Sequence, residues 1–289
     1  MPGPRWFIIS FCLSAASLVL RGQQQPAAGR PPNWPCTGAR AVDPSYVAVT
    51  EGTGGHLYLF APGEVTQSGA LMAWNFQHQE TVFRAMGEMA SAAHELSFPV
   101  DSMVESLVIA VSLQCKEAVA IVDPAGVESG GSGGERLDFR AGSALRIVHP
   151  TPGLWKVRLA GRGLYFVTAE AKSALTLDSA RFVEAGGRPG HEGLFPVKQP
   201  PALGSKALLQ LELSKAVGKV RVKLVDSQAR TLAELAAQPL DGTTGGSFLT
   251  AFILNAPSFR IAVEGVDERD WPFLRMDPPL TVATAPPPR

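Results

Sequence analysis

The sequence predicts a mainly β protein with two tandem antiparallel β-sandwich (immunoglobulin-like) domains, preceded by a short α/β segment with one long helix. The first observation is a period of two beyond Phe98, where apolar and polar residues alternate as in half-buried strands. The second is the composition of the breaks between these runs. The chain has 29 Gly and 24 Pro in 289 residues, which is typical of many strands joined by turns.

The first residues predict a targeting segment. Arg5 precedes an uncharged apolar run over residues 6–20, which suits a secretory signal and is short for a membrane span. We therefore expect a signal peptide over residues 1–22 and a secreted protein, extracellular or periplasmic, with no membrane span after signal removal; a retained anchor is the alternative. Residues 23–42 are rich in Pro, Gln and Gly and are expected to form a disordered arm.

The charge balance argues against one class of partner. The chain has 26 Lys and Arg against 26 Asp and Glu, so no overall field attracts nucleic acid, and we expect no nucleic-acid partner. A local basic row has two interpretations, contact with an anionic polysaccharide or the solvated face of a strand. The row consists of Lys215, Lys219, Arg221 and Lys223.

Residues 43–95 predict a helix-strand-helix segment. Residues 46–50 suit the end of a short helix, and residues 56–60 have the composition of a strand. From Ser68 to Glu95, apolar residues recur at steps of three and four or their multiples, the spacing of one helix face. These residues are Leu71, Trp74, Phe83, Met86, Ala90 and Ala93. We therefore expect one long helix over this range.

Two β-sandwich domains are expected after this segment. The alternating runs and their turns place the first domain at residues 96–172 and the second, of immunoglobulin-like size, at residues 173–282. The stretch TLAELAAQPL, residues 231–240, suits either a helical turn or a strand. The proline-rich residues 283–289 are expected to form a disordered tail.

The stretch IVHPTPGLWKVRL, residues 147–159, is the signature of the first domain. It places a proline-glycine turn before a strand, and its signature residues are Pro152, Gly153, Trp155 and Val157. We expect the apolar residues of this strand to share a buried face, opposite Lys156 and Arg158. The following residues 161–163, Gly-Arg-Gly, predict a tight hairpin into the next strand.

Motifs of chemistry are few, and we expect no catalytic residues, no cofactor and no enzyme activity. A Gly-x-Ser-x-Gly match at residues 130–134 has neither a strand before it nor a helix after it. The five histidines are scattered without the spacing of a zinc helix. We expect no metal site. The acidic loop with Asp267 and Asp270 offers hard oxygens to Ca²⁺, but it lacks the regular spacing of a calcium loop, and a solvated turn is the alternative.

Two cysteines remain beyond the predicted signal peptide, Cys36 and Cys115. In an oxidising compartment the pair is a disulfide candidate that would close a long loop and stabilise the fold by about 4 kcal/mol in the chain-entropy model. The alternative is two unlinked thiols, with Cys115 buried in a strand.

Five stretches resemble, in order and spacing, a segment of hemicentins and related extracellular von Willebrand A proteins. They are FPVDSMVESLVIAVSL, VAIVDPAGV, IVHPTPGLWKVRL, ALTLDSARFVEAGG and FRIAVEGVDERDWPFLRM. The likeness covers about residues 43–280, and its most specific parts are the P-x-x-G-x-W-x-V strand and the ending EGVDERDWPFLR. It implies an extracellular, non-enzymatic module whose β-sandwiches space or present contacts.

The segment YVAVTEGTGGHLYLF, with the predicted helix after it, looks like the last helix, strand and helix of a von Willebrand A domain. The metal-adhesion motif of that family, Asp-x-Ser-x-Ser, is absent, and too few residues precede position 43 to build its sheet. Metal-dependent ligand binding is therefore not carried over.

Three functions follow as hypotheses. The first is a secreted non-catalytic β-sandwich protein that mediates adhesion through a protein or glycan surface partner. The second is an accessory domain protein of an exported hydrolase system, because P-x-x-G-x-W-x-V also resembles a closing strand of domains that trail secreted proteases. The third is an enzyme in its own right, which a close carboxylate pair or a Ser/His pair within hydrogen-bond reach would support.

Overall fold

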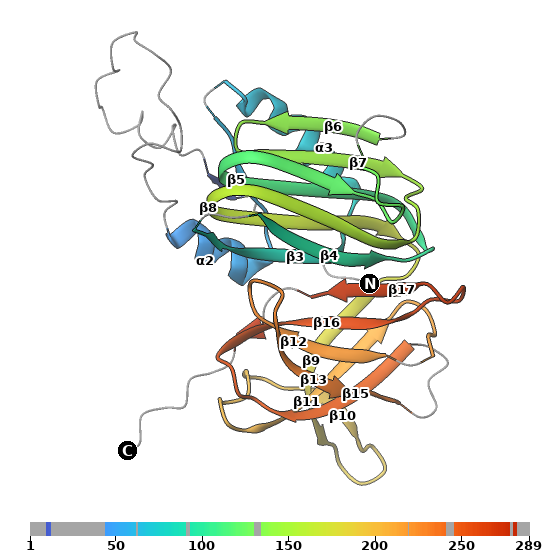
Figure 1. Cartoon of the computed structure of the whole chain (residues 1–289). Helices are drawn as coiled ribbons and strands as arrows, with labels where there is room; N and C mark the ends of the chain where they lie inside the picture. The colour runs from blue at the N-terminus through green and yellow to red at the C-terminus, as the bar shows by residue number, and fades with distance from the viewer. Residues whose placement is uncertain are drawn as a thin grey trace.

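The computed structural model describes residues 10–12, 44–61, 63–90, 93–129, 134–218, 220–240, 246–277 and 280–281. It is mainly β: two β units lie one above the other, and the helices lie against the upper one (Figure 1). The predicted arm and tail, Cys36, and the serine of the Gly-x-Ser-x-Gly match lie outside the described residues. Residues 10–12, within the predicted signal peptide, form strand β1 (Ser10–Cys12).

The first unit is built on one antiparallel sheet in the order β3-β8-β5-β7-β6, with β4 also paired to β8. Its strands are β3 (Glu80–Met89), β4 (His94–Val100), β5 (Val104–Val122), β6 (Gly134–Phe139), β7 (Gly142–Val148) and β8 (Gly153–Ser173). The apolar residues of β5 and β8 dominate its core, including Leu107, Ile109, Leu113, Trp155, Val157 and Val167.

Strand β8 is continuous, and the predicted hairpin at residues 161–163 is therefore wrong. On one side of β8, its first half pairs with β4 and its second half pairs with β3. On the other side, β5 pairs with both halves of β8. Gly161 and Gly163 have φ of 147° and 86°, and the β5–β8 register shifts beside them. The glycines thus bend one long strand instead of reversing the chain.

The predicted long helix over residues 68–95 is also wrong. The helix α3 (Ser68–Gln77) follows a 3₁₀ turn, η1 (Val65–Gln67), and ends before β3. Apolar spacing misled the prediction because β3 is covered on both faces, so its buried residues do not alternate. The first β unit therefore begins at Glu80 rather than at residue 96.

The remaining N-terminal elements cover the outer face of the first sheet. They are the helix α2 (Pro44–Thr53), the strand β2 (Leu57–Leu59), which pairs parallel with β1, and α3. The Leu59 N–H donates to Ser112 Oγ on β5 at 3.1 Å. Leu71 and Trp74 of α3 pack with Val108 of β5, so this layer closes the sheet from outside.

The second unit has two facing sheets, in the orders β10-β9-β11-β15-β14 and β13-β12-β16-β17, with β18 paired to β16. Its strands are β9 (Leu177–Gly186), β10 (Gly193–Pro196), β11 (Lys206–Leu213), β12 (Arg221–Val225), β13 (Thr231–Ala236), β14 (Gln238–Pro239), β15 (Gly246–Ile253), β16 (Ser258–Val266), β17 (Pro272–Met276) and β18 (Leu280–Thr281). Residues 231–240 are therefore strands rather than a helical turn. Apolar side chains of both sheets fill the core between them, including Leu209, Leu211, Val222, Phe259 and Ile261.

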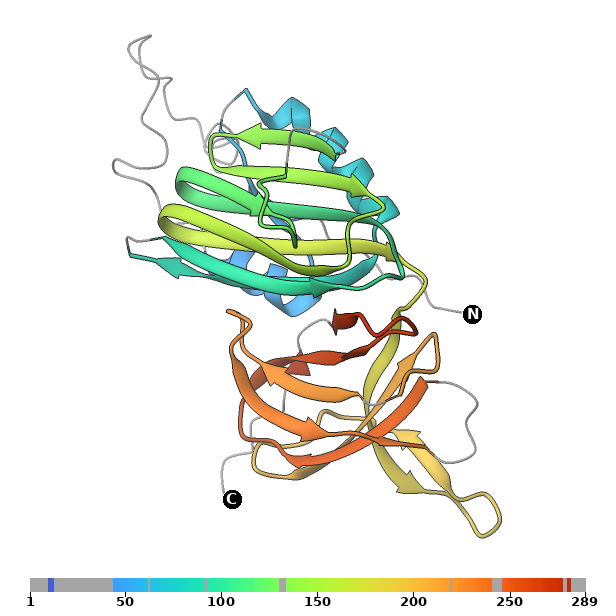
Figure 2. The same ribbon diagram turned by 45° about the vertical axis from the view of Figure 1, so that its right-hand side comes forward.

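The two units share a packed contact. Strand β17 packs against β3 and β4, as the turned view also shows (Figure 2). Leu274 and Met276 of β17 belong to the same apolar cluster as the core of the first unit. The Met86 N–H of β3 donates to the Ser227 carbonyl after β12 at 2.6 Å. The first sheet and the second unit therefore bury apolar surface jointly.

Candidate functional site

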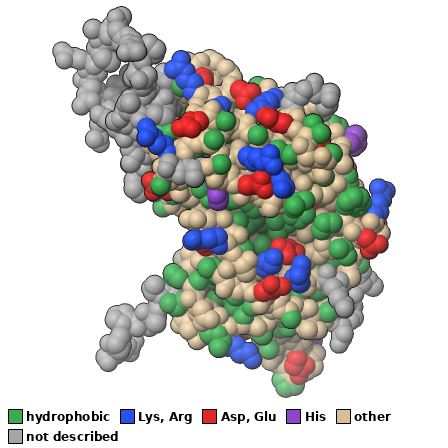
Figure 3. Space-filling view, in the orientation of Figure 1, with side chains coloured by type: hydrophobic (Ala, Val, Ile, Leu, Met, Phe, Trp, Pro, Cys, Tyr) green, Lys and Arg blue, Asp and Glu red, His purple; other side chains and the backbone are tan. Residues whose placement is uncertain are grey.

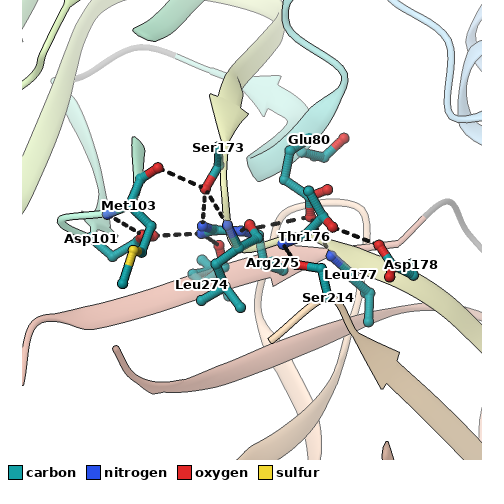
Figure 4. A network of polar contacts seen from close by, with 12 residues as sticks. Glu80, Asp101, Met103, Ser173, Thr176, Leu177, Asp178, Ser214, Leu274 and Arg275 are labelled. Atoms are coloured by element: carbon teal, nitrogen blue, oxygen red, sulfur yellow. Dashed lines mark hydrogen bonds and ion pairs between the residues drawn. The ribbon is translucent and has the colours of Figure 1, made fainter. Parts of the chain in front are cut away.

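A buried ionic network joins the two units, with Arg275 of β17 at its centre (Figure 4). Its guanidinium forms an ion pair with Asp101 at 2.7 Å and lies 3.7 Å from Glu80, and Arg275 and Asp101 are both fully buried. Arg275 also donates to the carbonyls of Leu175 and Leu274 and to Ser173 Oγ, at 2.8–2.9 Å. Since charged side chains are rarely buried unless paired, this network fixes the position of β17 against the first unit.

A second tie holds the turn between β16 and β17. Asp267 Oδ2 accepts hydrogen bonds from Ser102 N and Ser102 Oγ of the first unit, at 2.8 and 2.6 Å. Its other oxygen accepts from the N–H groups of Arg269 and Trp271 within the turn, at 2.8 and 2.9 Å. One side chain therefore both satisfies the backbone N–H groups of its own turn and attaches that turn to the first unit.

The hydrogen bonds to Asp267 explain the position of this residue, which with Asp270 was the predicted metal candidate. Burial by itself would raise the pKa of Asp267, but the hydrogen bonds from Ser102, Trp271 and Arg269 outweigh it and hold the pKa below its usual value. Asp267 thus acts as a turn cap, and Asp270 beside it adopts the left-handed region with φ of 61°. Among the described residues, no three His, Cys, Asp or Glu side chains form a group that could hold a metal ion.

The anchored turn presents Trp271 to solvent. Its side chain is 41% exposed, although its N–H and C=O are both bonded to Asp267. The indole lies beside the start of β8: a Cβ built on Gly153 would lie 2.8 Å from Pro124 and 3.9 Å from Trp271. Leu154 is 50% exposed on the first unit. A large aromatic ring is thus held on a rigid turn at the boundary of the two units.

We call this surface the waist patch, and it consists of Pro124, Leu154, Val266, Trp271 and Pro272. Figure 3 shows hydrophobic side chains gathered between the two units, with charged side chains above and below them. Exposed apolar groups that gather in one place mark sites of contact with a ligand or partner. Tryptophan in particular offers a large, rigid ring that loses little entropy on binding.

The predicted signature residues form the strand that carries the upper part of this surface. Pro152 precedes β8, and Gly153 begins it with φ of 136°. Trp155 and Val157 are buried in the core of the first unit, and Trp155 Nε1 donates to the Thr151 carbonyl at 2.9 Å. The predicted alternation is confirmed along this strand, and its outer residues are Leu154, Lys156 and Arg158.

The outer face of β8 carries a three-residue ionic cluster. One oxygen of Glu95, on the neighbouring β4, lies 3.1 Å from Lys156 Nζ, and the other lies 2.8 Å from Arg158 Nε. Hydrogen bonds from Arg158 and Lys156 lower the pKa of Glu95. Glu95 therefore positions Lys156 and Arg158 on the outer face of β8, beyond Leu154.

The predicted basic row lies in the second unit. Lys223 and Arg221 of β12 face Glu264 at 2.8 and 3.5 Å, and Arg221 also lies 3.7 Å from Glu234. Lys215 lies 3.8 Å from Glu268, and Lys219 is outside the described residues. These contacts favour the interpretation as a solvated strand face with cross-strand ion pairs.

Within the described part of the chain, His78 and Ser106 lie within hydrogen-bond reach of each other. His78 Nδ1 donates to the Trp74 carbonyl at the end of α3, so Nε2 accepts from the Ser106 hydroxyl of β5. Burial, more than the nearby charges, lowers the pKa of His78. His78 and Ser106 are only 2% and 8% exposed, which gives a substrate little access to the hydroxyl. We interpret the pair as a tie between α3 and the sheet.

The disulfide candidate is only half described. Cys115 is buried in β5, with its carbonyl against Gly161. Cys36 lies outside the described residues, so the bond between them stays a prediction.

Sequence reasoning missed the buried network and the anchoring of Trp271. Arg275 stands in an ordinary alternating strand, and its partners Glu80 and Asp101 lie far from it in the chain. One signal was present: an acidic turn followed by Trp and Pro at residues 267–272 places an aromatic ring where a solvated turn usually has polar groups.

Residues 81–174 match the model of the hemicentin galactose-binding domain-like family. The match spans about a third of the chain and coincides with the first β unit, from β3 to the end of β8. It covers neither α2, β2 and α3 nor the second unit, so the von Willebrand A likeness stays a prediction. The hemicentin-like character of the first unit is supported by this match.

The chain is similar to two solved structures, both at low sequence identity. No curated protein matches the chain. The crystal structure of Bacillus licheniformis lipase BlEst2 in propeptide form is 11% identical with a TM-score of 0.28, over 68% of this chain and 43% of that chain. A β-D-glucuronidase from Dictyoglomus thermophilum is 8% identical with a TM-score of 0.23, over 66% and 36%.

Within the described parts of the chain, no helix combines the length and the apolar run that crossing a bilayer requires.

Proposed function

We propose that this chain is a secreted, non-catalytic binding protein that contacts a glycan or protein outside the cytoplasm through the waist patch. The observation that carries the proposal is Trp271: a half-exposed tryptophan on a turn that Asp267 attaches to Ser102 of the first unit. Because the ring is already held in place, binding costs little additional ordering. The galactose-binding domain-like match of residues 81–174 supports a binding role for the unit that forms the upper half of the patch.

In this proposal the second unit is an immunoglobulin-like support. One of its sheets contains β9, β11 and β15, and the other contains β12, β16 and β17. This division agrees with the two sheets of an immunoglobulin-type sandwich. The helix-strand-helix layer over the first sheet would be the end of a von Willebrand A-like region. Both units then serve to present the patch at their boundary.

The test is a comparison of binding by the wild type and by Trp271→Ala. The purified full chain is applied to an array of purified glycans and to immobilised matrix proteins, and hits are measured by surface plasmon resonance. Loss of a central aromatic contact is expected to weaken binding by at least about tenfold. Phe195→Ala is the matched control, because Phe195 is 45% exposed on the distant strand β10.

The outcomes separate clearly. A ligand that binds the wild type and Phe195→Ala equally, and Trp271→Ala much more weakly, supports the proposal. Equal binding by all three proteins would place the contact elsewhere, and release of small products from the arrayed glycans would point to catalysis.

A further inference from the structure

We propose that the ligand of the waist patch is an acidic glycan, whose sugar ring stacks on Trp271 and whose anionic group binds Arg158. This inference rests on the proposed binding function and names the chemical class of its ligand. The anionic group is a carboxylate or a sulfate, because a guanidinium fork recognises both by paired hydrogen bonds.

In this proposal the ligand lies along the start of β8, from Trp271 to Arg158. Trp271 lies beside Gly153 at the start of β8, and the next outward residues along that strand are Leu154, Lys156 and Arg158. Outward residues of one strand stand about 7 Å apart, so Arg158 lies roughly 13 Å beyond Leu154. An extended oligosaccharide spans this distance, whereas a single sugar does not.

Arg158 is prepared to bind an anion. Its Nε is the atom that Glu95 contacts, at 2.8 Å, and its side chain is 55% exposed. The contact of Glu95 is to Nε, so the outer edge formed by the two terminal nitrogens can still bind a ligand, and holding the side chain in place lowers the entropy lost when a ligand binds. The positioning of Arg158 by Glu95 therefore favours paired contacts with an incoming acid.

The charge around Arg158 favours an anion at that end of the site, whereas the turn that carries Trp271 is acidic. Lys156 and Arg158 share the single carboxylate of Glu95, so the cluster keeps one net positive charge. On the β5 side, Glu117 lies next to Ala118 and Asp123 follows Val122, the partner of Lys156, while Glu128 lies 3.8 Å from Arg136. In the second unit, by contrast, Arg221 and Lys223 face two carboxylates and form a neutral cluster.

The residues beside Arg158 on the β5 side have small side chains. Its partner across the strand pair on β5 is Ala120, and the next outward pair is Ala118 with Ala160. These small side chains leave room over the sheet on one flank of Arg158, while Glu95 occupies the other flank. A bulky anionic sugar therefore approaches the guanidinium from the β5 side.

The experiment measures binding to polygalacturonate, dextran sulfate and neutral dextran by affinity electrophoresis at several salt concentrations. The proteins compared are the wild type, Arg158→Gln, Trp271→Ala and the control Arg221→Gln, whose side chain is 67% exposed. Loss of a charge-assisted contact is expected to weaken binding to one acidic polymer roughly tenfold in Arg158→Gln and little in Arg221→Gln. Binding is also expected to weaken as salt rises. Melting temperatures confirm that the variants fold.

The preferred polymer identifies the anionic group of the ligand. Preference for polygalacturonate identifies a carboxylate, and preference for dextran sulfate identifies a sulfate. A neutral glycan or protein ligand that needs Trp271 but not Arg158 overturns this inference and leaves the proposed function standing. Equal losses in Arg158→Gln and Arg221→Gln indicate general charge attraction and overturn it as well. If neither polymer binds and Trp271→Ala changes nothing on any ligand, both proposals fall.

Discussion

Replacing Arg275 is the sharpest test of the joint between the two units. Its guanidinium has no exposed surface, and it pairs with Asp101 at 2.7 Å while donating to Ser173 and to two carbonyls. Arg275→Met keeps much of the side-chain volume but removes the cation that lies 2.7 Å from the buried carboxylate of Asp101 and 3.7 Å from that of Glu80. Breaking a buried ion pair by removing one partner costs about 3–5 kcal/mol. We expect a loss of that size in the free energy of unfolding.

A triple variant separates lost charge balance from lost packing. Adding Asp101→Asn and Glu80→Gln to Arg275→Met removes the carboxylate charges. The remaining amide oxygens still accept the hydrogen bonds from Met103 N and Leu177 N, each at 3.0 Å in the wild type. Because neutral replacements of buried ion pairs are often tolerated, we expect the triple variant to recover more than about 1 kcal/mol over the single one.

The assay is urea unfolding at pH 7, followed by tryptophan fluorescence. Arg221→Met is the control, because its ion pair with Glu264 is long and exposed and should contribute at most about 1 kcal/mol. The reasoning fails if Arg275→Met lies within about 1 kcal/mol of the wild type, or if the triple variant is no more stable than the single one.

Two further predictions concern the first unit. Burial, together with the charge of Arg84, lowers the pKa of His56 from 6.5 to about 3. Since the unfolded chain binds this proton below pH 6.5 and the folded chain does so only near pH 3, His56 reduces stability by up to about 1.4 kcal/mol per pH unit as the pH falls through this window. His56→Phe, which retains a ring against Tyr58, should remove that slope, and parallel pH profiles of unfolding for variant and wild type would contradict this. Gly161→Ala places a Cβ 2.1 Å from the Cys115 carbonyl at φ of 147° and should destabilise by at least about 2 kcal/mol. Gly69→Ala, with open space around it in α3, should be neutral or stabilise by up to about 1 kcal/mol, and equal thermal midpoints for the two glycine variants would refute the strain.

The strands of the first unit show how far local patterns reach. Alternation along residues 153–159 identified the buried face of β8, because each outward side chain there meets solvent and each inward one meets the core. The same reasoning failed for β3, whose two faces are both covered, so its apolar residues followed no period of two. Apolar and polar residues alternate along a strand only when one of its faces is covered and the other meets solvent. When both faces are covered, the alternation that identifies a strand is absent.

The glycines of β8 show a second limit. Residues 161–163 have the composition of a tight turn, yet the chain runs on through them as a bent strand. The choice depended on β5, whose Cys115 carbonyl lies where a Cβ of Gly161 would stand. Local composition identifies where the backbone needs positive φ, and only the partner strand decides whether the result is a turn or a bulge.

The sequence by itself determined that this protein is mainly β, that turns rich in glycine and proline separate its strands, and which residues of the signature strand are buried. These properties depend on neighbours within a few residues. The tertiary structure alone decided that Arg275 pairs with Asp101 and Glu80, and that the turn of Asp267 carries Trp271 to the boundary of the two units. The physical reason is that these contacts join residues far apart in the chain, and burial of a charge or exposure of a ring exists only once the units pack together.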